Sequence, residues 1–306
     1  MSLRVRRRRH GWFGFMIAAI VALVGVGLLT ATIAAIRVPI APDVTQFRLA
    51  PAEAGAVRDP APLLAQVSQL ASASGATVGM VVTDLNVTQP APVRFSGDTP
   101  FPAASTYKLP LLMADAELIA SGSWKASDRI CFQDEEHEDG WFDDYEDGSC
   151  FTRQALAERA GIYSDNTAGH MLATNLGGGT VLNDYARQRG AKTSAFFAPN
   201  ETTASDLAAL MATEATGRAG GASAQRWLYP LLTHSEFEEG LPAGVPNGVT
   251  VTHKIGDVDQ TVNDVGLISG QGKKYVLAVM TIGLGGEAAW RLVAAISQAV
   301  WQYESS

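Results

Sequence analysis

Lysine, cysteine and clustered metal ligands are scarce in this chain of 306 residues. The five histidines are scattered and no His-Glu-x-x-His motif occurs, which excludes the common zinc-hydrolase pattern, so we expect neither a metal nor another cofactor. Charged residues make up only 18% of the chain and hydrophobic residues 47%. This balance excludes an intrinsically disordered protein and allows a sizeable buried core.

Basic side chains are also few after residue 37. Six arginines and no acidic residue lie within residues 1–37, which leaves 17 of the 23 basic side chains against all 31 acidic ones in the remainder. The net charge of that remainder is therefore −14, whereas the whole chain carries −8. An acidic body of this kind argues against nucleic acid as a partner.

The basic start adjoins a long apolar segment. Residues 11–36 carry no charge, and 26 such residues suffice to span a bilayer as a helix. The positive-inside rule then predicts a single-pass plasma-membrane protein with residues 1–10 in the cytoplasm and everything after residue 37 outside. A cleaved signal peptide, cut near Thr32-Ile33-Ala34, is the alternative and would make the protein secreted. Five prolines indicate an extended linker over residues 37–62.

The two cysteines, Cys131 and Cys150, are expected to form a disulfide in an exported chain. Between them, residues 134–147 hold nine acidic residues among 14, with aromatic residues interleaved. We interpret this segment as a solvated acidic loop closed by the disulfide. A calcium loop is the alternative, although the spacing does not match the EF-hand pattern.

The order of the predicted elements indicates an α+β fold for residues 63–306. Strands are expected over residues 77–84, 93–95, 249–255, 261–269 and 274–283, and helices over 62–74, 105–120, 152–160, 166–176, 180–189, 204–217, 224–232 and 287–303. The strands lie at both ends and the helices between them, so we expect an antiparallel sheet built from both chain ends with an inserted helical subdomain. The run Gly177-Gly178-Gly179 is interpreted as a helix stop.

Three short motifs follow one another along the chain. Ser105-Thr106-Tyr107-Lys108 opens a predicted helix, Ser164-Asp165-Asn166 opens another, and Lys254-Ile255-Gly256 ends a predicted strand. The first and the third are common by chance when taken alone, whereas the second is rare. Taken singly, Ser105 could be a helix cap and Lys108 an exposed helical lysine; the ordered trio favours a catalytic site.

The motifs fit the chemistry of serine acylation. Ser105 and Lys108 lie one turn apart on one helix face, and a serine hydroxyl needs a base before it attacks a carbonyl. A lysine can be that base if burial or a second cation lowers its pKa. Lys254 would supply positive charge for a substrate carboxylate and lower the pKa of Lys108. Ser164 would relay a proton to the leaving group, and Asn166 would hold the amide of the substrate.

The sequence resembles the class A β-lactamases and the related penicillin-binding proteins over about residues 63–303. The resemblance rests on residues 101–110, 164–168, 202–207, 253–256 and 263–266. It implies that Ser105 is the acylated nucleophile, Lys108 its base and Ser164 the proton relay. The backbone N–H groups of Ser105 and Asp257 would form the oxyanion hole, and Lys254 and Gly256 would belong to the substrate-binding strand.

Two departures from the family pattern bear on the function. Class A β-lactamases use a glutamate of the omega loop to activate the deacylating water, but residues 166–200 contain one acidic residue, Asp184, and no glutamate. Asp184 falls in a predicted helix, and Glu201 follows the expected position. In the third motif, Ile255 replaces the usual Thr or Ser and removes a hydroxyl that would bind the substrate carboxylate, a contact worth about 1.5–3 kcal/mol.

These features predict a membrane-anchored, monomeric serine hydrolase or acyltransferase. Its expected substrates are β-lactams or peptidoglycan stem peptides, with an acyl-enzyme at Ser105 that deacylates slowly. Two alternatives remain open. One is a β-lactam-hydrolysing enzyme with another water-activating group, such as Glu201. The other is a non-catalytic cell-wall binding protein on the same fold. Ile255 and the acidic loop would fit a protein that kept the pocket but drifted away from catalysis.

Overall fold

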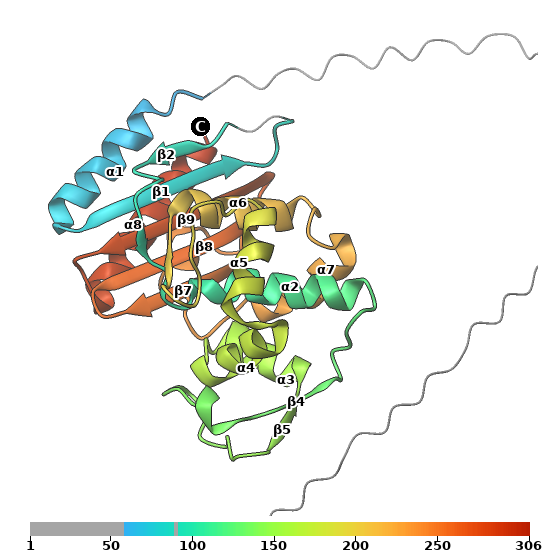
Figure 1. The fold of residues 1–306 in the computed structure, drawn as a ribbon. Helices are drawn as coiled ribbons and strands as arrows, with labels where there is room; N and C mark the ends of the chain where they lie inside the picture. The colour runs from blue at the N-terminus through green and yellow to red at the C-terminus, as the bar shows by residue number, and fades with distance from the viewer. Residues whose placement is uncertain (1–57, 89–90) are drawn as a thin grey trace, which may run out of the picture. The chain divides into compact units, whose positions relative to one another are not determined.

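A five-stranded antiparallel sheet forms the centre of the computed structural model, which describes residues 58–88 and 91–306 (Figure 1). The strands are β1 (Thr77–Asp84), β2 (Val93–Phe95), β7 (Thr250–Val258), β8 (Thr261–Gly270) and β9 (Lys273–Ile282). Their spatial order is β2-β1-β9-β8-β7, so β1 from the start of the domain pairs along its full length with β9 from its end. The predicted sheet built from both chain ends is thus confirmed.

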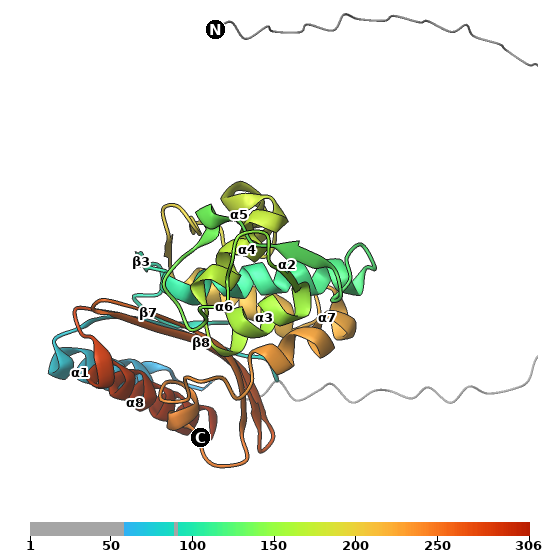
Figure 2. The ribbon, with the colours of Figure 1, turned by 90° about the horizontal axis from the view of Figure 1, so that it is seen from below.

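Two helices cover one face of this sheet. Figure 2 shows α1 (Ala61–Ser74) and α8 (Gly286–Glu304) side by side below the strands. Their apolar residues, among them Leu63, Val67, Val293 and Ile296, are buried against alternate residues of β1, β8 and β9. This alternation arises because successive side chains of a strand point to opposite faces.

The other face of the sheet carries a helical subdomain. It consists of α2 (Lys108–Ala120), α3 (Arg153–Ile162), α4 (Asn166–Leu176), α5 (Gly178–Gln188), α6 (Ala204–Ala215) and α7 (Gly221–Leu228). Helix α6 packs on β1, β8 and β9, while α2 contacts each of the other five helices. The first nine residues of α2 are all buried, so this helix is the core of the subdomain, with Lys108 at its buried N-terminal end.

Most predicted elements lie within two residues of the expected bounds, with four differences. The helix expected over residues 224–232 is α7, which begins at Gly221 and ends at Leu228. The pairs β3 (Phe101–Pro102) with β6 (Glu201–Thr202), and β4 (Arg129–Cys131) with β5 (Cys150–Thr152), were not predicted. The helix expected from residue 105 begins with a 3-10 turn, η1 (Ala104–Tyr107). The strand expected to end at residue 255 continues to Val258, because its hairpin with β8 pairs residues up to Thr261. The third motif therefore lies inside a strand and does not end it.

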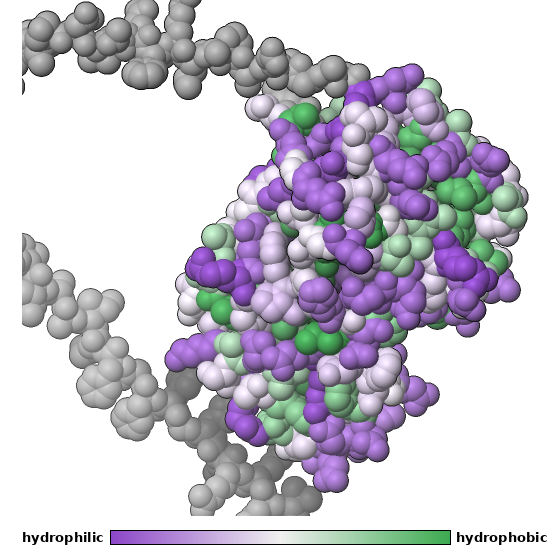
Figure 3. Space-filling view, turned by 180° about the vertical axis from the view of Figure 1, so that it is seen from behind, coloured by the Kyte–Doolittle hydropathy of each residue, from purple (hydrophilic) through white to green (hydrophobic). Residues whose placement is uncertain are grey.

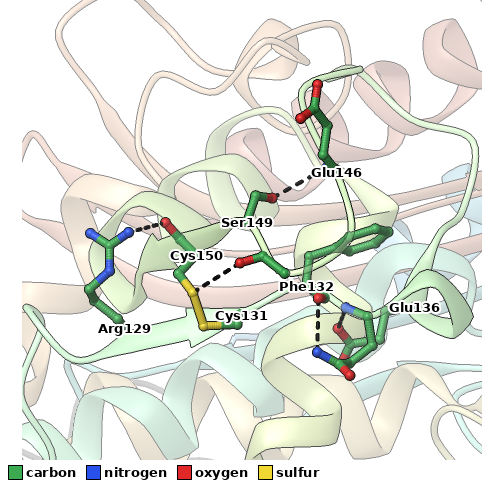
Figure 4. The surroundings of a disulfide bond; sticks show 9 residues. Arg129, Cys131, Phe132, Glu136, Glu146, Ser149 and Cys150 are labelled. Atoms are coloured by element: carbon green, nitrogen blue, oxygen red, sulfur yellow. Dashed lines mark hydrogen bonds between the residues drawn. A yellow bond between two sulfur atoms is a disulfide. The ribbon is translucent and has the colours of Figure 1, made fainter.

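The predicted disulfide is present. Cys131 and Cys150 face each other directly across the β4–β5 pair and are bonded (Figure 4). Arg129 donates a hydrogen bond to the carbonyl oxygen of Cys150 at 2.6 Å, which adds a second link at the same place. The acidic segment 134–147, with the short 3-10 turn η2 (Asp134–Glu136), is therefore a loop closed at its base. Two further 3-10 turns, η3 (Tyr229–Leu231) and η4 (Pro242–Gly244), precede β7.

The predicted cytoplasmic tip, membrane segment 11–36 and most of the linker 37–62 lie outside the described residues. Within residues 58–88 and 91–306, no helix is both long and apolar enough to cross a membrane. Arg58 already contacts Asp84 and Glu304, and α1 begins at Ala61, so the folded body starts before residue 63. On the face shown in Figure 3, apolar side chains are dispersed among hydrophilic ones.

Candidate active site

Ser105 lies in η1, on a turn that two asparagines hold from outside. Asn263 of β8 donates a hydrogen bond to the carbonyl oxygen of Pro102 at 2.9 Å, and Asn200 donates one to that of Ala104, also at 2.9 Å. Ala104 has a φ of 48°, in the left-handed region that alanine rarely adopts. The turn is therefore held in a costly conformation by contacts from two distant segments, which is typical of a functional site.

Lys108 is completely buried directly beneath Ser105. Its Nζ lies 2.9 Å from Ser105 Oγ, 2.6 Å from the carbonyl oxygen of Ser164 and 2.8 Å from Asn166 Oδ1. The last two atoms can only accept hydrogen bonds, because Asn166 Nδ2 donates to the carbonyl oxygen of Asp139 and so fixes the orientation of the amide. A neutral Lys108 amine would thus use both of its N–H groups on these acceptors and turn its lone pair to the hydroxyl of Ser105.

The environment also favours the neutral amine. Burial lowers the pKa of Lys108 to about 7, against the charges of Asp165 and Glu138, which raise it. Room for the side chain comes from Gly169 of α4, where an added Cβ would lie 2.6 Å from Lys108 Cε. A buried lysine with a pKa near neutrality is suited to act as a general base.

A second buried lysine, Lys254 of β7, completes the polar network. Its Nζ donates hydrogen bonds to Ser164 Oγ at 2.8 Å and to the carbonyl oxygen of Ile255 at 3.1 Å. Its pKa is lowered well below the usual value, first by burial and then by the charge of Lys108, while Asp264 opposes the shift. Ser164 has a φ of 58° and bridges the two lysines, since its backbone oxygen accepts from Lys108 and its hydroxyl from Lys254.

Behind Lys254, a buried ion pair joins β7 to β8. His253 Nδ1 lies 2.8 Å from Asp264 Oδ1, and both side chains are fully buried. Burial lowers the pKa of His253, but the charge of Asp264 and its hydrogen bond outweigh it and raise the pKa to about 9. The pair fixes the register of the two strands at the level of the third motif.

The acidic loop is tied to the second motif through Asp165, which is fully buried. The Asp165 carboxylate accepts hydrogen bonds from the backbone N–H of Trp141 at 2.9 Å and the hydroxyl of Tyr145 at 2.7 Å. It also caps α4 by accepting from the backbone N–H of Ala168 at 2.8 Å. An added Cβ at Gly140 would lie 2.5 Å from Asp165 Oδ2, so this glycine lets the loop approach. Consequently the loop is not merely a solvated closure; it forms part of the site.

These elements enclose a cleft with a volume of ≈ 580 Å³. It is lined by Ser105, Asp139, Gly140, Trp141, Ser164, Asn166, Phe237, Ile255 and Asp257. Trp141, which is 58% exposed, meets Phe237 edge to face with 6.0 Å between the ring centroids. At Gly256 an added Cβ would lie 2.6 Å from the carbonyl oxygen of Ala103, so β7 packs closely against the turn that carries Ser105.

The structure thus brings the predicted catalytic and substrate-binding side chains together in two layers, with Gly256 packed against the turn that carries Ser105. Ser105, Ser164, Asn166 and Asp257 line the cleft, while Lys108 and Lys254 lie buried beneath it. The disulfide of Cys131 and Cys150 lies at the base of the loop and outside the lining. Sequence reasoning missed Asp139, Gly140, Trp141 and Phe237 as lining residues. For the loop residues, the sequence feature that could have indicated a role in the cleft is a tryptophan within a highly acidic stretch. No sequence feature indicates that Phe237 lines the cleft.

The two acidic residues considered for deacylation do not line the cleft. Asp184 lies on α5 and pairs with Arg187, with 55% of its side chain exposed. Glu201 is exposed on β6, which pairs with β3 just before η1. Within the described residues, the carboxylates that line the cleft are those of Asp139 and Asp257. Nowhere in residues 58–88 and 91–306 do three or more His, Cys, Asp or Glu side chains cluster in a way that could hold a metal ion.

Comparison with known proteins gives one family and many similar structures. The model of the beta-lactamase enzyme family matches residues 62–304. Among solved structures, PBP-A is 28% identical with a TM-score of 0.73, over 79% of this chain and 95% of that one. A beta-lactamase from Sphaerobacter thermophilus is 26% identical with a TM-score of 0.73, over 81% and 98%. An ancestral class A beta-lactamase is 26% identical with a TM-score of 0.69, over 78% and 99%. No curated protein sequence gives a match.

Proposed function

Because the chain belongs to the beta-lactamase enzyme family, whose members include serine hydrolases and penicillin-binding proteins, we propose that Ser105 is acylated by β-lactams or peptidoglycan stem peptides. The contact of Lys108 Nζ with Ser105 Oγ at 2.9 Å carries this proposal. The other two partners of this amine are acceptors only, so its lone pair is directed at the serine hydroxyl. This is the geometry that a general base for serine requires.

The acylation step follows from this arrangement. Lys108 takes the proton from Ser105 Oγ, the oxygen bonds to the carbonyl carbon of the substrate, and a tetrahedral oxyanion forms. The backbone N–H groups of Ser105 and Asp257 are the proposed donors to this oxyanion. Two observations support this proposal. Both residues line the cleft, and Asp257 lies on the edge strand of the sheet, where alternate N–H groups have no strand partner.

The leaving nitrogen receives its proton through the second motif. Ser164 Oγ accepts a hydrogen bond from Lys254 at 2.8 Å, so its own proton is free to be donated into the cleft. Lys254 passes its hydrogen-bonded proton to Ser164 Oγ as Ser164 donates to the leaving nitrogen, the C–N bond breaks, and the acyl-enzyme remains with the proton of Ser105 on Lys108. Asn166 uses its Oδ1 and one N–H on protein partners, which leaves one N–H for a substrate carbonyl.

Slow deacylation is the second part of the proposal. Hydrolysis of the ester needs a base that activates water, and the carboxylates lining the cleft, Asp139 and Asp257, form no hydrogen bond with Ser105 or Lys108 among the described contacts. A similar solved structure, the L158E mutant of PBP-A, is described as an acyl-enzyme complex with penicillin G; it is 28% identical to this chain. A persistent adduct of the same kind is proposed here.

The location of the protein is proposed from the sequence. The uncharged residues 11–36 after five arginines would anchor the chain in the plasma membrane with its catalytic domain outside. A disulfide in the catalytic domain supports an oxidising compartment. A monomer is proposed for the folded body.

A single experiment tests the acylation and its lifetime. The full chain is purified in detergent and incubated with a fluorescent penicillin, and the mass of the intact protein is followed after excess probe is removed. We expect one adduct that persists for hours and is absent in Ser105→Ala. Rapid loss with multiple turnovers would refute slow deacylation and support the β-lactam-hydrolysing alternative. If the folded wild-type chain gives no adduct with β-lactams or stem-peptide thioesters, the acylation proposal fails and a binding protein is favoured.

A further inference from the structure

The charge of the catalytic cleft indicates which acyl donors the site accepts. Two carboxylates, those of Asp139 and Asp257, lie among the residues that line it, and the same lining includes no lysine or arginine. They come from different parts of the chain, since Asp139 belongs to the acidic loop and Asp257 to β7. A substrate carboxylate entering this cleft would therefore meet like charge from both elements.

The two lysines beneath the cleft do not offset these charges. Lys108 and Lys254 are 0% and 1% exposed, and both amines are engaged: Lys108 by Ser105 Oγ and the carbonyl oxygen of Ser164, and Lys254 by Ser164 Oγ and the carbonyl oxygen of Ile255. Burial is the largest cause of the lowered pKa of both amines, and it favours their neutral forms. Neither amine is a free cation that faces the cleft.

A hydroxyl contact for a carboxylate is also missing at the third motif. Ile255 lines the cleft with only 3% of its surface exposed, and its side chain can donate no hydrogen bond. The neighbouring carboxyl of Asp257 is partly buried, which raises its pKa against a hydrogen bond from Trp290 that lowers it. The wall formed by Ile255 and Asp257 thus joins an apolar side chain to a carboxyl group and offers a substrate carboxylate no hydrogen-bond donor from either side chain.

The wall formed by the acidic loop has the composition of a cation site. Trp141 is 58% exposed, lines the cleft and follows Asp139 by two residues. An exposed indole face attracts ammonium groups, and a carboxylate beside it adds a favourable charge. The wall is held in place because the backbone N–H of Trp141 and the hydroxyl of Tyr145 both donate to Asp165.

We propose that this site selects acyl donors that carry an ammonium group, and no free carboxylate, next to the scissile amide. The inference rests on the proposed acylation at Ser105. It assigns Ile255 and Asp257 the exclusion of a carboxylate, and Asp139 and Trp141 the attraction of the ammonium. These four residues determine specificity and take no part in the proton transfers at Lys108 and Ser164.

The test uses three penicillin probes that differ only at the carboxyl group: the free acid, the methyl amide and the aminoethyl amide. The second-order acylation rate constant of the full chain in detergent is measured for each by intact-protein mass. We expect the aminoethyl amide to react fastest and the acid slowest, with about a tenfold gap for each unit of charge. Equal rates, or a faster reaction of the acid, would overturn the inference while leaving acylation at Ser105 established.

Variants assign the selectivity to residues. Asp257→Asn and Ile255→Thr are each expected to raise the rate of the acid by about tenfold relative to the methyl amide. The matched controls are Asp184→Asn, which removes the same charge from α5 outside the lining, and Ile255→Val, which shortens the side chain without adding a hydroxyl; both should keep the wild-type ratio. If no probe forms an adduct, the proposed function itself has failed. If the controls shift the ratio as much as the variants do, the cleft residues do not set it.

Discussion

Gly169 of α4 offers a sharp test of the role of Lys108, because a single methyl group placed there would displace the catalytic amine. A Cβ at this position would lie 2.6 Å from Lys108 Cε and 2.6 Å from the hydroxyl of Tyr107, and both distances are shorter than an ordinary van der Waals contact. Optimal carbon–carbon separations are about 3.5–4.0 Å, so Lys108 has to move by about 1 Å. Its amine would then leave hydrogen-bonding distance of Ser105 Oγ, now 2.9 Å away.

The expected loss in acylation rate is on the order of 100-fold, the effect of a 1 Å misplacement of a catalytic group. The cost in folding stability is smaller. Overpacking costs about 1–3 kcal/mol, and the better helix propensity of alanine over glycine offsets about 1 kcal/mol of it. Gly169→Ala should therefore remain folded yet react slowly.

The assay is the acylation rate constant with a fluorescent penicillin, corrected for the folded fraction from thermal denaturation. The control is Gly179→Ala in α5, another helical glycine, where the nearest atom to an added Cβ is Phe197 Cβ at 3.5 Å. That variant should keep the wild-type rate. A folded Gly169→Ala protein that reacts at the wild-type rate would refute the argument that the position of Lys108 controls acylation.

Two other predictions follow from buried ionisable groups. Because Lys108 acts as a base only when neutral, the acylation rate should rise with pH and reach half its plateau near pH 7, where its pKa lies; a flat profile from pH 5.5 to 8.5 would exclude this base. The Glu214 carboxylate has no hydrogen-bond partner, and its pKa is raised to about 7, first by burial and then by Glu117. The folded state holds a proton here that the unfolded chain releases above its ordinary pKa of 4.5, so this group should lower stability as pH rises between 4.5 and 7. Glu214→Gln should accordingly be more stable than wild type at pH 8 by about 2–3 kcal/mol and no more stable at pH 4, measured by urea denaturation; equal stability at pH 8 would contradict the assignment.

The long elements of the fold could be predicted from the sequence because their signals are local. Residues 77–84 were expected as a strand with these bounds, and α4 was expected and found over residues 166–176. The short pairs β3–β6 and β4–β5 were not expected, since segments of two or three residues have little pattern of their own and these depend on partners elsewhere in the chain. The equally short β2 could be expected because it returns on β1 directly after a turn. Nor could the end of β7 be predicted, because its hairpin with β8 decides it.

The candidate site divides in the same way. Ser105, Lys108, Ser164 and Lys254 could be named from motifs, since their spacing reflects the chemistry. The wall formed by Asp139 and Trp141 could not, because charge density alone indicates a solvated loop. What places that loop against the cleft is the buried carboxylate of Asp165, which accepts from Trp141 and Tyr145. A sequence shows neither this burial nor the burial of Lys108 itself, which lowers the pKa of its amine.

The pairing of β1 with β9 has a consequence for how the chain folds. The residues of α1 and β1 are synthesised before the rest of the folded body, but the neighbour that β1 needs along its full length is the last strand to be made. Until Lys273–Ile282 is available, β1 exposes an unpaired edge that can pair with other chains. Contacts between such distant segments form slowly, whereas those among α2 to α7 are more local. Chaperones that bind extended segments would therefore act first on Thr77–Asp84, and loss of the last strand and helix would leave an aggregating chain rather than a weakened enzyme.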